Sequence, residues 1–184
     1  YEYILAVSDV DGDATSITIL EKPSWLTFKD NGSYSTSVEP WVTSGFTDGQ
    51  SMVVKDGYLY IAGRGDGVIY KIDRETKAMT TVATGMPYVV GIAVASDGTI
   101  YASSETQHVI WKVSPGGSPQ VIVGTGVAGY NETTDASLAQ VRGPYGVKLS
   151  ADETHLYIAD GNRLIRKVEL ATNTISMVAG MASG

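Results

Sequence analysis

The stretch PYGVKLSADETHLYIADGNRLIRKVEL, residues 144–170, decides the fold because it contains three short apolar runs separated by turn-forming residues. The runs lie at residues 146–149, 156–159 and 164–168, and Asp, Glu, Gly and Asn stand between them. Short runs divided in this way are typical of antiparallel strands joined by tight turns. The stretch therefore predicts three consecutive strands.

The same pattern occurs twice earlier in the chain. Tyr60 and Tyr101 mark one position of these two copies, and Lys71 and Lys112 mark another. Each pair is separated by 41 residues, so two independent landmarks give one period. This agreement indicates a true internal repeat. The earlier copies occupy residues 51–72 and 91–113.

A repeat of this length with three or four short strands is typical of a β-propeller blade, which forms one small sheet. The sequence predicts an all-β fold, a partial β-propeller of about three four-stranded blades. We expect the equivalent aromatic residues Tyr60, Tyr101 and Tyr157 to pack between neighbouring sheets. The expected blades occupy residues 47–85, 86–124 and 125–184.

The third copy resembles the NHL repeat. Its matching positions are Pro144, Gly146, Tyr157, Ala159, Asp160, Asn162, Arg163, Ile165, Arg166, Lys167 and Val168. The step from Tyr101 to Tyr157 is 56 residues, and the extra residues, at 125–140, resemble the glycine-rich loop between blades of that family. The resemblance covers residues 45–184 and implies NHL-like blades. Residues 63–66 and 104–108 depart from the usual turn of the repeat.

Residues 1–37 have a different character. The segments VSDVDGD, at 7–13, and PSWLTF, at 23–28, resemble part of the cadherin-like or Ig-like modules of bacterial surface proteins. The alternative is a degenerate fourth blade, in which residues 6–9 take the place of Ile158-Ala159-Asp160. Residues 38–46 would then form the junction. Both ends of the chain resemble interrupted elements, so we expect it to be a piece of a longer protein.

Composition excludes several classes of function. The chain has 20 acidic and 13 basic residues and a net charge of −7, so it lacks the basic surface that nucleic acids and anionic membranes require. It contains no cysteine, which excludes disulfides and thiolate metal sites. No apolar run reaches the length of about 18 residues that a membrane-spanning helix needs. We therefore expect neither a nucleic-acid partner nor membrane insertion.

Three carboxylates alternate at Asp9, Asp11 and Asp13, a spacing that suits a Ca²⁺ loop. An EF-hand would require glycine and an acidic residue where Ala14 and Leu20 stand, so that type of site is excluded. A cadherin-like Ca²⁺ site remains as one interpretation, and a solvated acidic turn is the other. Apart from possible Ca²⁺, no cofactor is expected.

No set of residues predicts catalysis. Propeller enzymes of the lyase or lactonase type hold a channel metal with polar side chains near blade turns. The candidates here are His108, His155, Glu105, Asp160 and Asn162, and their spacing does not form a metal-binding motif. We therefore expect no catalytic residues. A propeller enzyme of this type is the alternative function.

Basic and surface residues give further expectations. We expect the basic cluster of Arg163, Arg166 and Lys167, with Arg142 not far off in the sequence, to form ion pairs rather than an RNA-binding face. The expected acidic partners are Asp160, Glu169 and Asp152.

Asn31 and Asn131 fit the N-glycosylation pattern, which applies if a eukaryote secretes the protein. Tyr130 and Tyr145, in or beside the inserted loop, are candidates for a contact surface.

Geometry limits the function. Three blades cannot close a ring, since propellers use about four to eight. The remainder of the polypeptide, a second copy or head-to-tail polymerisation must cover the open blade faces. The leading hypothesis is a non-catalytic extracellular or cell-surface scaffold for binding or assembly, with a subunit of a secreted filament or appendage as one version.

Overall fold

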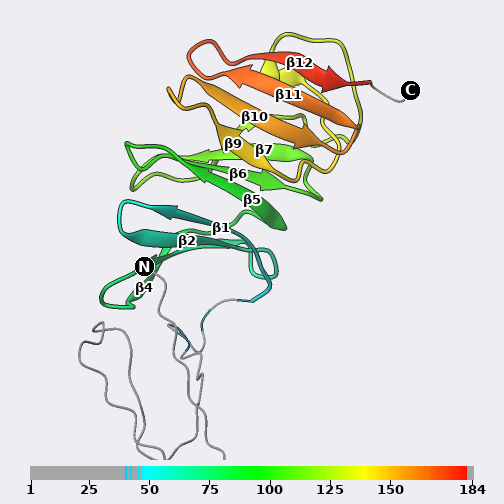
Figure 1. Cartoon of the computed structure of the whole chain (residues 1–184). Helices are drawn as coiled ribbons and strands as arrows, with labels where there is room; N and C mark the ends of the chain where they lie inside the picture. Colours follow the sequence, from blue (N-terminus) through cyan, green and yellow to red (C-terminus); the bar gives the residue numbers. More distant parts are fainter. Residues whose placement is uncertain (1–39, 41, 43–44, 46, 182–184) are drawn as a thin grey trace, which may run out of the picture. The chain divides into compact units, whose positions relative to one another are not determined.

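The computed structural model describes residues 40, 42, 45 and 47–181, all of which belong to the second of two units, Pro40–Gly184. Within it, twelve strands form three four-stranded antiparallel sheets, stacked one on the next (Figure 1). This confirms the predicted all-β fold with four-stranded propeller blades. The expected cadherin-like or Ig-like segment, its alternative as a degenerate blade, and Asp9, Asp11, Asp13 and Asn31 lie outside the described residues.

Each sheet is a meander in which every strand pairs with the next along the chain. Blade 1 contains β1 (Gly49–Lys55), β2 (Tyr58–Gly63), β3 (Val68–Asp73) and β4 (Met79–Ala83). Blade 2 contains β5 (Val89–Val94), β6 (Ile100–Ser104), β7 (Val109–Val113) and β8 (Gln120–Val123). Blade 3 contains β9 (Val147–Leu149), β10 (His155–Asp160), β11 (Leu164–Glu169) and β12 (Thr174–Gly180).

Turn chemistry fixes the register of the first hairpin. Lys55 pairs with Tyr58, so only Asp56 and Gly57 connect β1 to β2. Both residues have positive φ, 49° and 82°, as a type I′ turn requires. Asp-Gly is among the sequences best suited to this turn, and it sets which residues of β2 face each side of the sheet.

Apolar side chains between the blades form the core. β5 packs on β1 and β2, and β9 packs on β5 and β6, so the first strands of blades 2 and 3 each cover the preceding blade. Tyr60 and Tyr101 are 7% and 5% exposed and lie in the two interblade cores, as predicted. The prediction for Tyr157 is wrong: it lies on the side of blade 3 against which no described sheet packs, and it is half-buried.

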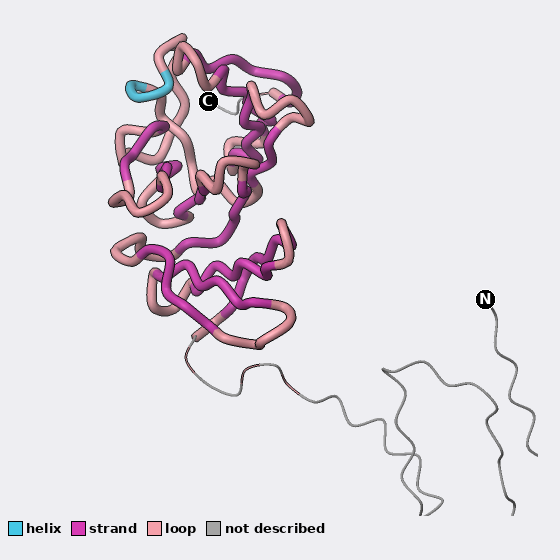
Figure 2. Tube along the Cα trace, turned by 90° about the vertical axis from the view of Figure 1, so that its left-hand side faces the viewer, coloured by secondary structure: helices cyan, strands magenta, loops and turns pink. Residues whose placement is uncertain are grey.

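The inserted loop is more ordered than the sequence indicates, because it contains a short 3₁₀ helix, η1 (Ala136–Leu138) (Figure 2). The Asp135 carboxylate caps it by accepting from the Ser137 N–H at 2.9 Å. Ala136 and Ala139 are fully buried in the core between blades 2 and 3. The loop thus supplies part of that core. None of the described segments forms a helix long and apolar enough to cross a membrane.

One carboxylate joins the three blades where their first strands end. Glu153, after β9, accepts hydrogen bonds from the Ser96 N–H at 2.9 Å and from the Ser96 hydroxyl at 2.6 Å. The ammonium group of Lys55, at the end of β1, lies 3.6 Å from the Glu153 carboxylate. The Ser96 bonds, followed by the nearby Lys55 charge, lower the pKa of Glu153.

Candidate functional site

We call the opposite end of the sheets, where the first strands begin, the rim. A hollow of about 410 Å³ lies there. β1, β5 and β9 begin at the rim, and β2, β6 and β10 end there, because the strands are antiparallel. Residues that precede a first strand therefore meet residues that follow a second strand. All three blades line the hollow, with Gln50, Arg64, Val90, Glu105 and Tyr145 among the contributors.

Three side chains that line this hollow, Arg64, Glu105 and Tyr145, form what we call the rim cluster together with Asp48 and Tyr88, which contact Arg64. Arg64 Nη1 donates to Asp48 Oδ2 at 3.2 Å, and Arg64 Nη2 donates to Glu105 Oε2 at 3.4 Å. The Tyr145 hydroxyl donates to the other Glu105 oxygen at 3.0 Å. The Arg64 guanidinium also lies 5.4 Å from the centre of the Tyr88 ring, within cation–π range.

The repeat itself places Arg64 beside Glu105. Each residue directly follows the second strand of its blade, and the two are separated by 41 residues, the repeat period. In blade 3 the same position is Gly161, whose N–H donates to the Arg142 carbonyl at 2.8 Å. A side chain there would collide with that carbonyl. Blade 3 therefore contributes to the rim through Tyr145 instead.

Backbone contacts fix Tyr145 at the rim. Its N–H donates to the Ala159 carbonyl at 3.0 Å, and its carbonyl accepts from the Ser103 hydroxyl. Gly91 lies directly against this carbonyl, so close that a β-carbon would overlap it. A glycine in blade 2 thus allows the Tyr145 backbone to approach.

The rim cluster combines two carboxylates with one guanidinium. Hydrogen bonds from Gln50 and then Arg64 lower the pKa of Asp48, and the bond to Asp48 is the main cause of a raised pKa at Arg64. The hydrogen bond to Glu105 raises the pKa of Tyr145. The pairing favours the ionised forms of Asp48 and Arg64 and keeps the Tyr145 hydroxyl protonated.

Asp160 and Arg166, both matched to the NHL repeat, form a buried ion pair. Their side chains are 0% and 3% exposed and lie 3.4 Å apart, which confirms the expectation that Arg166 pairs with Asp160. Asp160 also accepts from the N–H groups of Arg142 and Asn162, at 2.9 and 3.0 Å. Arg166 donates to the Gln140 carbonyl at 2.8 Å. These residues attach the inserted loop to blade 3.

The two histidines lie apart. His108 is in the turn between β6 and β7, at the rim, and its Nδ1 accepts from the Gly143 N–H at 3.0 Å. His155 begins β10, at the other end of the sheets, and its Nδ1 lies 2.7 Å from the Thr154 hydroxyl. Within residues 47–181 and the three described before them, no three His, Cys, Asp or Glu side chains are grouped to hold a metal.

Asn131 and Tyr130 lie in the inserted loop, beside a second hollow of about 560 Å³. The Asn131 amide donates to the Leu138 carbonyl at 3.0 Å and accepts from the Gln140 N–H at 2.7 Å. The Tyr130 ring centre lies 5.6 Å from the Arg166 guanidinium. Tyr130 and Tyr145, the two predicted contact residues, therefore border different hollows.

Sequence reasoning named Tyr145 as a contact residue and Glu105 only as a candidate for a channel metal, and it missed Asp48, Arg64 and Tyr88. Arg64 was considered only as part of a departure from the NHL turn. The aligned repeats could have pointed to Arg64, because it lies one period before Glu105 and carries the opposite charge.

Comparisons with known proteins support the fold. No protein-family model and no curated protein matches the chain. An auxiliary nutrient binding protein from Bacteroides thetaiotaomicron is 20% identical over 69% of this chain and 35% of its own, with a TM-score of 0.57. The extracellular domain of a proposed one-component system from the same organism is 12% identical over 76% and 18%, with a TM-score of 0.55. Virginiamycin B lyase from Staphylococcus aureus is 15% identical over 68% and 39%, with a TM-score of 0.50.

At these identities the similarity establishes the propeller-like fold and nothing further. The aligned region spans less than two fifths of each of the three known chains.

Proposed function

We propose that this chain is a non-catalytic binding module of an extracellular or cell-surface protein, and that its ligand binds at the rim. The observation that carries the proposal is the convergence of Arg64, Glu105 and Tyr145, from three blades, on one hollow. Two structures that share the fold, a nutrient binding protein and an extracellular domain, support this class of function.

The rim cluster fits a ligand rich in hydroxyl groups. Arg64 already pairs with Asp48 and Glu105, so the cluster has one more carboxylate than cations and does not favour an anion. Hydroxyl groups both donate and accept, and they match a site where a guanidinium, carboxylates and a phenol lie side by side. Tyr88 and Tyr145 are 46% and 54% exposed, so part of each aromatic side chain is available to an apolar surface. A neutral carbohydrate has both properties.

Binding to an array of neutral and acidic oligosaccharides, followed by calorimetry on the best ligand, tests the proposal. Glu105→Gln and Tyr145→Phe should each weaken binding by at least about tenfold, since a hydrogen bond to a charged group contributes about 1.5–3 kcal/mol and about 1.4 kcal/mol is tenfold in Kd. Tyr130→Phe is the matched control, because Tyr130 borders the other hollow. Absence of any carbohydrate binding, or a loss caused by Tyr130→Phe alone, would contradict the proposal. A ligand that proves to be a peptide would contradict the ligand class but leave the site intact.

A propeller lyase or lactonase with a channel metal is the alternative function, and the lyase that shares the fold favours it. Metal analysis of the purified chain after dialysis separates the two. One equivalent of metal retained by a variant lacking residues 1–39 would support the enzyme. Calcium lost on replacement of Asp9, Asp11 and Asp13 by Asn would instead support the predicted Ca²⁺ loop.

A further inference from the structure

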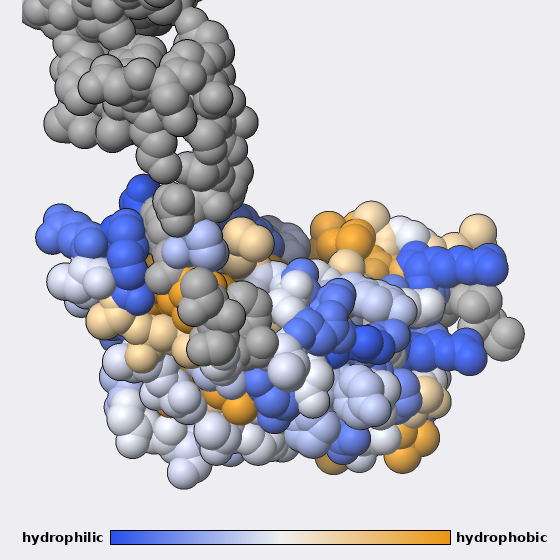
Figure 3. Space-filling model, turned by 90° about the horizontal axis from the view of Figure 1, so that it is seen from below, coloured by the Kyte–Doolittle hydropathy of each residue, from blue (hydrophilic) through white to orange (hydrophobic). Residues whose placement is uncertain are grey.

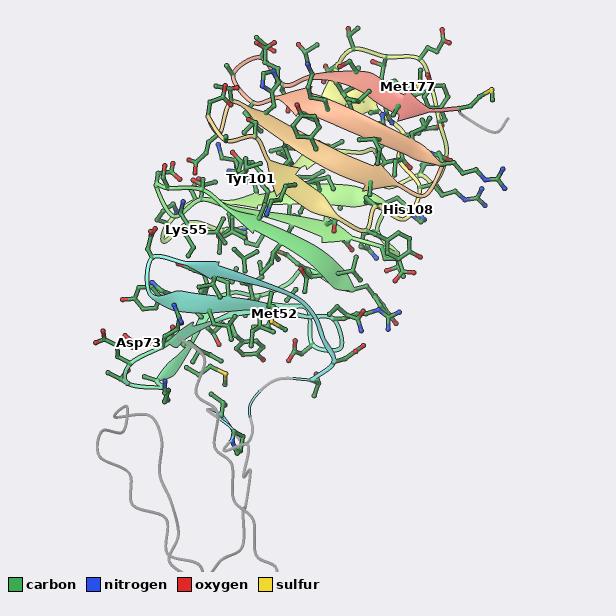
Figure 4. All side chains as sticks on the ribbon, in the orientation of Figure 1. Met52, Lys55, Asp73, Tyr101, His108 and Met177 are labelled. Carbon is green, nitrogen blue, oxygen red and sulfur yellow. The ribbon has the colours of Figure 1, made fainter. Side chains whose placement is uncertain are left out.

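The second hollow, of about 560 Å³, lies between the inserted loop and the outer strand β12 and has the size of a small-ligand site. The loop pairs with the start of β12, because the Ile175 N–H donates to the Thr134 carbonyl at 2.8 Å. Beyond Ile175, no backbone hydrogen bond joins the loop to β12 within the described residues, and the hollow lies there, beside Met177 (Figure 4). The extra residues of the third repeat thus form one wall of this hollow.

The hollow lies on the side of blade 3 that faces blade 2. Ile175, which lines it, belongs to the core between these two blades. Met177 pairs with Arg166 on β11, so their side chains are neighbours on one face of the sheet, and both line the hollow. Ile165 and the opposite face of blade 3 contribute nothing to it. Whatever covers that opposite face therefore leaves this hollow unchanged.

A buried guanidinium supplies the chemistry of the hollow. Arg166 is 3% exposed, and its Nη1 donates both to the Gln140 carbonyl and to the Asp160 carboxylate. Its Nε and Nη2 have no hydrogen-bond partner among the described residues. In that part of the chain, Trp111 Nε1 is the one side-chain polar atom that is fully enclosed and unpaired. Nε and Nη2 are therefore open to the hollow that Arg166 lines.

The open edge of Arg166 fits a carboxylate. The N–H groups of Nε and Nη2 lie side by side on a guanidinium and match the two oxygens of that group. The Asp160–Arg166 pair is neutral as a whole, and the exposed Glu132 also borders the hollow. These two carboxylates repel a doubly charged phosphate more strongly than a singly charged group. The site therefore favours a monocarboxylate.

The other walls suit an apolar group. Ile175, Met177 and the half-buried Tyr130 line the hollow, and the Tyr130 ring centre lies 5.6 Å from the Arg166 guanidinium. Apolar surface alone does not mark a site, because it also lies among polar side chains on the face seen from below (Figure 3). Here the apolar side chains stand beside a buried guanidinium with free donors, and this combination distinguishes the hollow.

We propose that this hollow binds a small monocarboxylate that carries an apolar group. The carboxylate accepts hydrogen bonds from Nε and Nη2 of Arg166, and the apolar group packs on Ile175 and Met177. The site shares no residue with the rim cluster. It therefore goes beyond the proposed function, and its test does not depend on carbohydrate binding at the rim.

NMR titration of the full, isotope-labelled chain with N-acetylleucine, N-acetylmethionine and N-acetylphenylalanine tests the proposal, with the carboxamide of each as the neutral match. At least one acid should shift the amide signals of Thr134, Ile175 and Ser176 and leave those of the rim unchanged. Its carboxamide should bind at least about tenfold more weakly. Equal binding of acid and carboxamide, shifts confined to the rim, or no binding of any acid at millimolar concentration would overturn the proposal.

Substitutions then locate the contact. Arg166→Lys keeps the charge but lacks the paired donors, and it should weaken binding of the acid at least about tenfold. Met177→Asp places a negative charge beside the carboxylate and should have a similar effect. Val178→Asp is the matched control, because Val178 is 50% exposed, close to the 55% of Met177, but does not line the hollow. Its dissociation constant should change less than about threefold.

Glu132→Gln should strengthen binding about two- to fivefold, because it removes a negative charge from the border of the hollow. Since Arg166→Lys alters a buried ion pair, circular dichroism must show that this variant is folded. If it is not, the exposed change Met177→Asp decides the matter. Binding that Met177→Asp leaves unchanged, or that Val178→Asp weakens equally, would overturn the site.

Discussion

Arg64 and Glu105 occupy the same position in adjacent repeats and form an ion pair, with 3.4 Å between Arg64 Nη2 and Glu105 Oε2. Because both residues follow the second strand of a blade, the stacking of blades brings them together at the rim. Opposite charges at one repeat position thus link blade 1 to blade 2. Tyr145 extends the link to blade 3 through its bond to the same carboxylate.

The coupling between Arg64 and Glu105 should be small. Their side chains are 35% and 27% exposed, so solvent screens the pair. We expect a double-mutant cycle of Arg64→Ala and Glu105→Ala to give about 0.2–1 kcal/mol in urea unfolding, falling with added salt. An Arg163→Ala cycle with Glu105→Ala is the control and should show no coupling. A coupling energy that does not change with salt would contradict a solvent-screened ion pair between Arg64 and Glu105.

Removal of one member of the buried Asp160–Arg166 pair should be severe. Asp160→Ala leaves the Arg166 guanidinium buried and removes the acceptor of two N–H groups. The expected loss in the free energy of unfolding is about 3–5 kcal/mol. Glu169→Ala, an exposed change on the same blade, should stay within about 0.5 kcal/mol. Equal effects of the two substitutions would show that the network does not anchor the loop.

Gly91→Ala should disturb the rim, because its methyl group would overlap the Tyr145 carbonyl. The expected loss of stability is about 1–3 kcal/mol, with weaker binding at the rim as Tyr145 moves. Gly146→Ala is a matched control from the equivalent position of blade 3, since its methyl group would only approach Ala159 at 3.8 Å within the chain. Chemical denaturation of both variants measures the difference. A neutral Gly91→Ala would mean that the blades separate easily at this point.

Asp152 should make stability depend on acid pH. Hydrogen bonds from the Ser150 and Thr154 side chains, and then from the Thr154 backbone N–H, lower the pKa of Asp152 to about 2. Because the folded-state pKa lies below the ordinary 3.8, the carboxylate stabilises the folded chain above that value, and this contribution disappears as the pH falls towards 2. Urea unfolding should show Asp152→Asn less stable than wild type at pH 7 and similar near pH 2. A difference that persists at pH 2 would contradict this origin.

The sequence by itself determined the blades. The 41-residue period, the alternation within strands and the Asp56-Gly57 turn are local features, and each specifies structure through bonds between neighbouring strands. The pairing of Arg166 with Asp160 was also predictable, because β11 lies beside β10 and only six residues separate the two. Burial of Tyr60 and Tyr101 followed from their place on a repeated face.

Only the tertiary structure decided which residues meet between blades and which faces stay open. Arg64, Glu105 and Tyr145 come from three sheets, and the stacking of those sheets sets their distances. Tyr157 has the same local sequence as Tyr60 and Tyr101, yet its surroundings differ because no described blade follows β12. A repeat specifies each blade through local bonds, whereas the burial of a blade face depends on whether a neighbour is present.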